Sequence, residues 1–566
     1  MPVATRKVRF AVLSRTQIRE GAFVKMVPVA ARIIATATFL LGASIAARAQ
    51  SGTAVLTHHN DYWRTGWNST ETILTPSSIS LASNNFGVIA TVNNLDNTVE
   101  AQPLIVPNQI IGCPPNQTII ICQTGLTAGI YNVVYVATVA NTVYAINADN
   151  GQILLSRNFG SLAGCGGIKS TPVIDSVSGT MYVMTHINVG SIPTYTLRAL
   201  NLKDLADTVA PFYITTSNTS HTLSNGTVYG FDPSSTCQRS ALLLVRGSIF
   251  AGFRGNEIGI TPPSAVGRGW LLGWTASTLA PLAPLLTDEQ AAAADKFFLS
   301  SIWMSDSGIA SDGTNLYFAT GNSDPSGTSY NPPIKNIEES VVKVTPTLTV
   351  TSFFTPSNFA ALDAADNEIG SGGVLVIPKS SLVVAGGKDG RMFLLNSASL
   401  GGYTPGGPDH VLNMQNIGGC WCAPSYFMGS DGIGRVVSSG GNAVTTWKIM
   451  QTGSPPTPHL VQDGTGLISA SSKDPGFFTS VSSNSTSSGV IWAVGRPAAG
   501  STSVTLYAFN ATSVTGTLPL LGQYPAGTWT GPGNANIVPV VANGKVYVAS
   551  GGGVGAGTLT IFGLNP

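Results

Sequence analysis

Apolar and polar residues alternate at every second position over many short stretches of the chain. A clear copy covers residues 132–138 and 141–147, where valine, tyrosine and isoleucine recur within an alternating pattern. Such alternation with enrichment in Val, Tyr and Phe is typical of β-strands. Asn-Gly, Asp-Gly and Ser-Gly pairs separate the stretches, and these pairs favour tight turns between antiparallel strands. The pattern therefore predicts an all-β chain.

The strand pattern repeats. Each copy has a short apolar strand near a Pro or Gly, a turn, a strand with aromatic residues, and a further alternating strand. About eight copies begin at intervals of roughly 50 to 70 residues, the size of one propeller blade. We therefore expect an eight-bladed β-propeller of four-stranded antiparallel blades. The expected first strands lie at residues 101–106, 171–175, 240–244, 308–313, 373–377, 423–427, 479–482 and 538–548.

The two ends of the repeat region indicate how the ring closes. Residues 86–92 form a lone strand pattern before the first copy, and the last copy stops at residues 559–564. Pairing these two strands would protect both sheet edges, so we expect the N-terminal strand to complete the last blade. The sequence indicates one clear helix, at residues 287–295, with a capping box from Thr287 to Gln290.

The first fifty residues have the order of a secretory signal. Basic residues precede an apolar stretch at 33–45, and Ala-Arg-Ala at 47–49 matches a cleavage signature. No later window reaches the roughly 20 continuous apolar residues of a membrane helix. We therefore expect a signal peptide at 1–49, an N-terminal extension at 50–84 and the propeller at 85–566, in a periplasmic or secreted protein without a transmembrane segment.

Charge narrows the possible partners. The 566 residues include 28 Lys and Arg against 27 Asp and Glu, a net charge of +1, and the mean hydropathy is +0.23. This balance gives no electrostatic reason to expect nucleic acid or an anionic membrane as a partner. The hydropathy also excludes a disordered chain. We expect a monomer.

Six cysteines permit disulfide bonds in an exported protein. Cys113 and Cys122 flank a turn-rich segment between apolar strands, which predicts a cross-link between them. Cys420 and Cys422 are separated by one residue, so a bond between them is expected to strain the backbone. A structural pairing of these two is still favoured over soft metal ligands or a redox thiol. No Cys-x-x-Cys-His occurs, so no haem is expected.

Several short motifs resemble the PQQ-like β-propeller repeat family, whose members include the quinoprotein alcohol dehydrogenases; the chain is most similar to an exported branch. The resemblance extends over the whole mature chain and implies the same fold. Those dehydrogenases hold pyrroloquinoline quinone (PQQ) and Ca²⁺ or a lanthanide in a central funnel. The motifs are Asn-Asp-Tyr-Trp-Arg-Thr-Gly at 60–66, Glu-Ala-Gln-Pro-Leu at 100–104, Ala-Leu-Asp-Ala-Ala-Asp at 361–366, Gly-Gly-Lys-Asp-Gly at 386–390 and Asn-Gly-Lys-Val-Tyr-Val at 543–548.

The resemblance implies a set of metal ligands and a base. Glu257, within Gly-Asn-Glu-Ile-Gly, is similar to the ligand Glu, and Asn322, after Tyr-Phe-Ala-Thr-Gly, is similar to the ligand Asn. Glu368 would complete the set and remove the alcohol proton, with Asp363 and Asp366 as nearby alternatives. Oxygen ligands suit a hard cation such as Ca²⁺. In Glu368 the chain has a Glu where the family uses Asp.

The resemblance also implies contacts to the quinone. Trp303 lies where the floor of the quinone would be, and Lys388 matches the base that contacts its carbonyl. The family covers the other quinone face with two adjacent cysteines, but only Cys165 is found in that region. Trp421 lies in Gly-Gly-Cys-Trp-Cys-Ala-Pro, which has the outline of a family motif but lacks its Asn.

Two functions therefore remain open: a quinone-dependent dehydrogenase acting on an alcohol or sugar, and a non-catalytic propeller that binds a protein or glycan. The missing cysteine pair favours the second. Convergence of Glu257, Asn322, Glu368 and Lys388 at one funnel mouth would favour the enzyme, whereas an exposed apolar patch would favour binding. A metal at His58 and His59 is the weaker interpretation, because the adjacent Asn-Asp indicates a polar turn.

Overall fold

The computed structural model describes residues 52–114, 119–255, 267–290, 298–323, 336–468, 475–531 and 535–565. All of them belong to one compact unit, Ala49–Pro566. The expected signal peptide, Glu257 and positions 291–295 of the expected helix lie outside the described residues.

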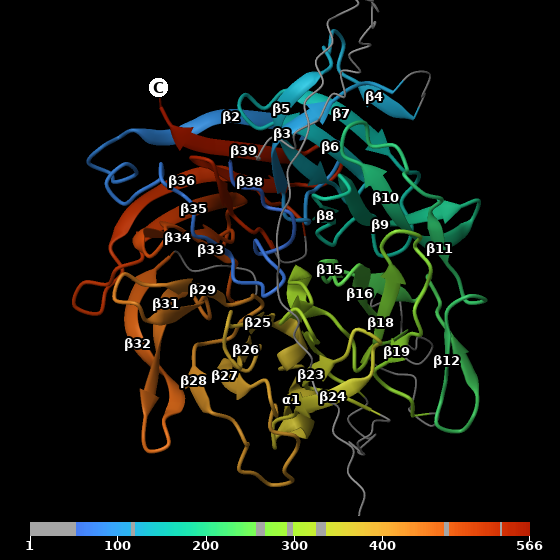
Figure 1. Cartoon of the computed structure of the whole chain (residues 1–566), viewed down its shortest axis with the longest axis vertical. Helices are drawn as coiled ribbons and strands as arrows, with labels where there is room; N and C mark the ends of the chain where they lie inside the picture. The colour runs from blue at the N-terminus through green and yellow to red at the C-terminus, as the bar shows by residue number, and fades with distance from the viewer. Residues whose placement is uncertain are drawn as a thin grey trace, which may run out of the picture. The chain divides into compact units, whose positions relative to one another are not determined.

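The described residues form eight four-stranded antiparallel blades arranged in a ring, as predicted, and Figure 1 shows them following one another in chain order. Blade 1 contains β3 (Leu104–Ile111), β5 (Gly129–Ala137), β6 (Thr142–Asn147) and β7 (Ile153–Asn158). Blade 2 contains β8 (Val173–Asp175), β9 (Thr180–Val189), β10 (Ile192–Asn201) and β11 (Phe212–Ile214). Blade 3 contains β15 (Leu243–Val245), β16 (Ser248–Gly255), β18 (Trp270–Thr275) and β19 (Leu285–Leu286). Blade 4 contains β21 (Ala310–Ser311), β22 (Leu316–Ala319), β23 (Val341–Val344) and β24 (Val350–Phe354).

The second half of the ring continues the pattern. Blade 5 contains β25 (Val374–Val376), β26 (Leu382–Gly386), β27 (Arg391–Asn396) and β28 (Asn413–Asn416). Blade 6 contains β29 (Ser425–Met428), β30 (Gly434–Ser438), β31 (Ala443–Thr452) and β32 (Thr457–Leu467). Blade 7 contains β33 (Thr479–Asn484), β34 (Ser487–Gly495), β35 (Ser503–Asn510) and β36 (Leu520–Thr528). Blade 8 contains β37 (Val540–Ala542), β38 (Lys545–Gly551), β39 (Gly557–Leu564) and, as its outer strand, β2 (Phe86–Leu95).

The ring closes through β2, which pairs antiparallel with β39 from Phe86↔Leu564 to Leu95↔Gly557. The predicted closure by an N-terminal strand is therefore confirmed. The blue β2 and the red β39 lie side by side in Figure 1. This pairing leaves the last blade with the same number of strands as the others and covers its outer edge.

Several short elements lie outside the four main strands of each blade. They are β1 (Trp67–Asn68), β4 (Ile120–Cys122), β12 (Ser220–Thr222), β13 (Val228–Gly230), β14 (Thr236–Gln238), β17 (Gly267–Arg268), β20 (Phe298–Leu299), the helix α1 (Phe359–Ala365) and the 3₁₀ turns η1 (Met304–Asp306) and η2 (Ile369–Ser371). The sequence did not predict α1. The predicted capping box is absent, because the Thr287 hydroxyl donates instead to the carbonyl groups of Gly269 and Ser300.

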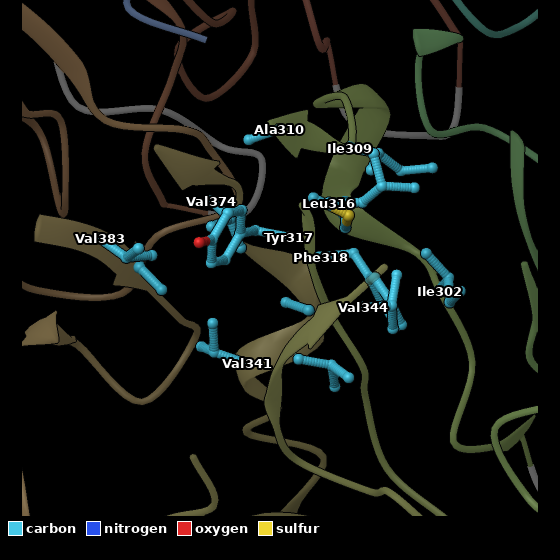
Figure 2. Close-up of a cluster of buried hydrophobic side chains, with 14 of the residues drawn as sticks. Ile302, Ile309, Ala310, Leu316, Tyr317, Phe318, Val341, Val344, Val374 and Val383 are labelled. Atoms are coloured by element: carbon cyan, nitrogen blue, oxygen red, sulfur yellow. The ribbon is translucent and has the colours of Figure 1, made fainter. Parts of the chain in front are cut away.

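Alternation along each strand supplies apolar side chains to both neighbouring blades. Figure 2 shows this in blade 4, where Tyr317 lies toward Val374 and Val383 of blade 5, and Val344 lies on the other side near Ile302. All five side chains are fully buried. Successive strand residues point to opposite faces, so each sheet is packed on both sides, which explains the apolar bias of its strands.

Residues 55–68 run inside the ring, and we call this segment the inner belt. The belt hydrogen-bonds to the innermost strand of every blade or, in blade 3, to the residue directly before it. The pairs are Val55 with Ile105, Leu56 with Ile174, Arg64 with Leu242, Tyr62 with Ser311, Trp63 with Val376, Thr65 with Tyr426, Gly66 with Val481 and Asn68 with Val541. Residues 55–68 of the expected N-terminal extension thus contact all eight blades from inside the ring.

Arg64 fixes the middle of the belt and is fully buried. Its guanidinium donates to the carbonyl oxygens of Ile309, Leu242 and His58 and to the hydroxyl of Thr57, at 2.7 to 3.0 Å. A buried charge is tolerated only with such partners. The side chain therefore links blades 3 and 4 through the belt.

Candidate functional site

Strand direction divides the loops of the propeller between two rims. Connections between the first and second, and between the third and fourth, strands of a blade lie on one rim, which we call the hairpin rim. Connections between the second and third strands, and between successive blades, lie on the opposite crossover rim. The described candidates for the metal and quinone site all belong to crossover-rim connections: Asn322, Lys388, Trp303, Trp421, Cys165, Asp363, Asp366 and Glu368.

Lys388 and three other candidates, Asp366, Glu368 and Asn322, lie together. The Lys388 Nζ lies 3.0 Å from Asp366 Oδ1, 3.0 Å from the Asp366 carbonyl oxygen and 3.2 Å from Glu368 Oε1. Asn322 Nδ2 donates to Asp366 Oδ1 at 3.3 Å. The loop after β26 thus reaches back to the connection between blades 4 and 5. We call this group, with Glu338, Glu339 and Asp363 described below, the Lys388 cluster.

The hydrogen-bonding capacity of Lys388 is filled within the protein. An ammonium group has three N–H donors, and the structure supplies three acceptors within 3.2 Å. Its nitrogen also lies 4.2 Å from the ring centre of Trp421. Burial would lower the pKa of Lys388, but Glu368 and Asp366 raise it above its ordinary value. Lys388 is therefore a charged anchor between two blades.

Sequence reasoning missed two carboxyl groups in this cluster, Glu338 and Glu339, which lie just before β23. Both are buried, and Glu338 Oε2 and Glu339 Oε1 have no hydrogen-bond partner among the described residues. Burial, and then the Asp363 carboxylate, raise the pKa of Glu338 to about 8. Burial, and then Glu368, raise the pKa of Glu339 well above its usual range. The sequence signal that could have identified them is a pair of adjacent acidic residues just before an apolar strand.

The other carboxyl groups are held by local contacts. Asp363 Oδ1 accepts the backbone N–H of Ser323 at 2.8 Å, and Glu368 Oε1 accepts the Ser371 hydroxyl at 2.5 Å. Gly321 packs so closely that an added Cβ would lie 2.7 Å from Glu368 Oε2. Glu368 therefore has little space to change its position.

The expected metal ligands are brought together only in part. Asn322 and Glu368 lie in the same cluster, but Glu257 is outside the described residues. Within the described part of the chain, no group of three or more His, Cys, Asp or Glu side chains is arranged to hold a metal ion. Asn322 Oδ1 is buried without a described partner, so one oxygen of the expected ligand set remains unused.

Trp303 lies in a cationic environment that differs from that of a quinone floor. The guanidinium carbon of Arg254 lies 3.7 Å above the ring centre, and that of Arg239 lies at 4.7 Å. Arg239 also pairs with Glu100 at 3.2 Å. Guanidinium groups stack favourably on indole faces. A face that Arg254 covers at this distance is closed to a planar cofactor.

The cysteines form three disulfides. The predicted Cys113–Cys122 pair is confirmed, and Cys165 pairs with Cys237 across 72 positions. Cys420 also pairs with Cys422, with Cα atoms 5.1 Å apart, within the usual range for disulfides. The structural pairing favoured for these two cysteines is therefore present. Two backbone hydrogen bonds fix this turn: the Cys420 N–H donates to the Gly387 carbonyl oxygen, and the Trp421 N–H donates to the Pro475 carbonyl oxygen.

His58 and His59 form no metal centre with other described residues. Their rings stack with centroids 4.6 Å apart, and both are buried in the inner belt. Burial lowers the pKa of His59 to about 4. The expected turn is present at these residues, but it lies inside the ring and not at a polar surface.

Comparisons with known proteins define the class of fold. No protein-family model and no curated protein matches the chain. The structure is similar to quinohemoprotein alcohol dehydrogenase from Comamonas testosteroni, with a TM-score of 0.57 and 13% identity over 92% of this chain and 81% of that one. It is also similar to a europium-containing methanol dehydrogenase, with a TM-score of 0.56 and 11% identity over 90% and 98% of the two chains.

A quinohemoprotein alcohol dehydrogenase, ADHIIG, from Pseudomonas putida HK5 gives a TM-score of 0.55 at 13% identity, covering 90% of this chain and 80% of that one. The chain is thus an eight-bladed β-propeller of the quinoprotein dehydrogenase type of fold. At this identity the likeness concerns fold, because one propeller architecture carries many functions. In the described residues, no helix is long and apolar enough to cross a membrane.

Proposed function

We propose that this protein is an exported binding propeller that does not carry out quinone chemistry. The observation that carries the proposal is the filled donor set of Lys388, the residue matched to the quinone-contacting base. All three of its acceptors come from Asp366 and Glu368. A lysine engaged in this way has no remaining donor to place on a cofactor carbonyl.

The other residues expected around a quinone fit it poorly. Arg254 covers a face of Trp303. Cys165 is bonded to a distant cysteine in the connection before blade 3, whereas the related enzymes use two adjacent cysteines as a cover. Trp421 packs against Lys388. Each expected contact is therefore used to join parts of the propeller.

Export is part of the proposal. Three disulfides support it, because such bonds persist in oxidising compartments outside the cytoplasm. The arrangement of basic and apolar residues before Gln50 is consistent with the same conclusion.

The alternative function is a quinone-dependent dehydrogenase. One observation favours it: Asn322, Glu368 and Lys388 meet in one cluster, and Asn322 Oδ1 is buried without a described partner. In that case Asn322 and Glu368 would contribute to a hard-cation site.

Calorimetric titration of PQQ into the purified mature chain, with Ca²⁺ and separately with La³⁺, tests the proposal. We expect no saturable heat with either metal at protein concentrations of about 50 µM. The matched variant is Glu257→Ala. Saturable, metal-dependent PQQ binding that Glu257→Ala abolishes would overturn the proposal and establish the dehydrogenase.

A further inference from the structure

A crevice opens on the hairpin rim between blades 6 and 7. Its cavity has a volume of about 270 Å³, close to the lower end of the roughly 300–1,000 Å³ typical of small-molecule sites. One wall comes from the end of β29, the β29–β30 turn, β30, β31 and β32. The other comes from the end of β33, the start of β34 with the turn between them, and the loop after β35. The crevice shares no residue with the Lys388 cluster.

Four ionised side chains form the blade 6 wall. Arg435 Nε lies 2.8 Å from Asp463 Oδ2, and Arg435 Nη1 lies 2.8 Å from Asp431 Oδ1. Lys448 Nζ lies 3.0 Å from Asp463 Oδ1 and 3.6 Å from Asp431 Oδ2. The two acids and two bases balance, so the wall has no net charge.

Pairing keeps this wall ionised. Burial acts against the charged forms of Asp463 and Arg435, but their mutual hydrogen bonds lower the pKa of Asp463 and raise that of Arg435. A hydrogen bond from Arg435 lowers the pKa of Asp431 in the same way. The wall therefore presents fixed donors and acceptors over the physiological pH range.

Much of the remaining lining carries hydroxyl groups, beside the apolar side chains of Phe427, Met428 and Ala511. Ser430, Thr486, Ser488, Thr512 and Ser513 line the cavity. None of these five hydroxyls makes a hydrogen bond within the part of the chain that the structure describes. Four of them belong to exposed residues, so the cavity can be reached from solvent.

The loop that carries Thr512 and Ser513 is fixed against blade 6. The N–H of Thr465 on β32 donates to the Gly516 carbonyl oxygen, and the N–H of Leu518 donates to the Thr465 carbonyl oxygen, both at 3.0 Å. These bonds hold the two walls at a constant separation. The cavity is thus a preformed feature of two packed blades.

We propose that this crevice binds a neutral polyhydroxylated small molecule, a single sugar ring or a cyclic polyol. Each ligand hydroxyl can donate to a carboxylate and accept from the Lys448 ammonium or a protein hydroxyl group. Because the four charges balance one another, neither a cation nor an anion gains a net partner there. The inference goes beyond the proposed function, because it holds whether or not the opposite rim binds a quinone.

The test is calorimetry on the mature chain with glucose, galactose, mannose, N-acetylglucosamine and myo-inositol, each up to about 10 mM. Glucuronate and glucosamine serve as anionic and cationic probes of similar size. We expect at least one neutral probe to bind, and both charged probes to bind more weakly than glucose.

The key variant is the triple change Thr486→Ala, Thr512→Ala and Ser513→Ala. It removes three lining hydroxyls from loops and should weaken binding at least about tenfold, since each lost neutral hydrogen bond costs on the order of 1 kcal/mol. Thr517→Ala is the matched control, because Thr517 is an exposed residue of the same loop that does not line the cavity. It should bind like the wild type.

Three outcomes would overturn the inference: no binding of any neutral probe, binding unchanged in the triple variant, or tighter binding of a charged probe than of glucose. Thermal unfolding of the triple variant, with a midpoint equal to that of the control, shows that lost binding is not lost folding. The PQQ titration depends on the other rim, so failure of one proposal leaves the other standing.

Discussion

The Lys388 cluster on the crossover rim and the crevice on the hairpin rim are both built from paired charges, but they differ in what those charges leave unused. In the cluster, Lys388 spends all three donors on Asp366 and Glu368, and Gly321 packs against Glu368. In the crevice, Arg435 and Lys448 hold Asp431 and Asp463 at the edge of a cavity whose five named hydroxyl groups make no hydrogen bond with described residues.

The difference teaches that charged residues at a predicted position do not by themselves define a site. A site also needs space and unused hydrogen-bonding capacity. The cluster has residues that match an enzyme motif, yet its contacts are consistent with a joint between blades 4 and 5. The crevice matches no motif, yet it has space and hydroxyl groups that make no hydrogen bond with the described part of the chain.

The largest expected difference between the two regions is the loss of stability when the lysine of each is replaced. Lys388→Met should destabilise the protein by about 3 kcal/mol, because it leaves the buried Glu368 without its cationic partner. Lys448→Met should cost less than about 1 kcal/mol, since Lys448 is partly exposed and Arg435 still pairs with both acids. Urea denaturation followed by tryptophan fluorescence measures both; equal losses would refute the distinction.

A second test uses pH. The folded-state pKa of Glu338 is raised to about 8. At a pH between the ordinary pKa of a glutamic acid and about 8, the native state therefore keeps a proton that the unfolded state has released. The stabilisation that protonated Glu338 adds to the free energy of unfolding is therefore fully present below about pH 4.5 and is lost as pH rises toward about 8. The slope is at most about 1.4 kcal/mol per pH unit.

Glu338→Gln should remove this slope and be more stable than the wild type at about pH 8, by roughly 2 kcal/mol. Denaturation midpoints between about pH 5 and 8.5 measure the difference. Subtracting the two curves isolates Glu338 from Glu339 and Asp61, whose pKa values burial also raises. Parallel curves for the two proteins would show that Glu338 does not hold the extra proton.

The smallest expected effect contrasts two hydroxyl groups. Ser371 is fully buried and donates to Glu368, so Ser371→Ala should cost about 1.5 kcal/mol. Thr512 is exposed and makes no side-chain hydrogen bond with described residues, so Thr512→Ala should change stability by less than about 0.5 kcal/mol. Thermal midpoints measure both, and a costly Thr512→Ala would mean that the crevice hydroxyls already have partners.

The fold could be predicted from sequence because propeller strands carry a strong local signal. The expected starts at 171–175 and 373–377 contain β8 and β25, and closure by β2 follows from the lone strand at 86–92. The inner belt could not be predicted. Its hydrogen bonds connect residues far apart in sequence, as between Asn68 and Val541, and no local pattern records such contacts.

The candidate site could be predicted only in outline. Short motifs indicate that Asn322, Lys388 and Glu368 lie on one rim, and the structure brings them together. Motifs do not reveal which donors are already used, because this depends on distances between loops of neighbouring blades. The approach of Arg254 to Trp303 joins a residue on β16 to a residue in the connection before blade 4, and likewise has no signature in spacing.

The inner belt also has a consequence for the order of folding. Residues 55–68 precede every blade in the chain, yet the last of their partners, the carbonyl group of Val541, lies 473 positions after Asn68. The belt therefore cannot complete its contacts until nearly the whole chain has been synthesised. We therefore expect assembly of the ring to be a late and collective event, because long-range contacts form slowly. A chain truncated before blade 8 would lack both the partner of Asn68 and the strand β39 that pairs with β2.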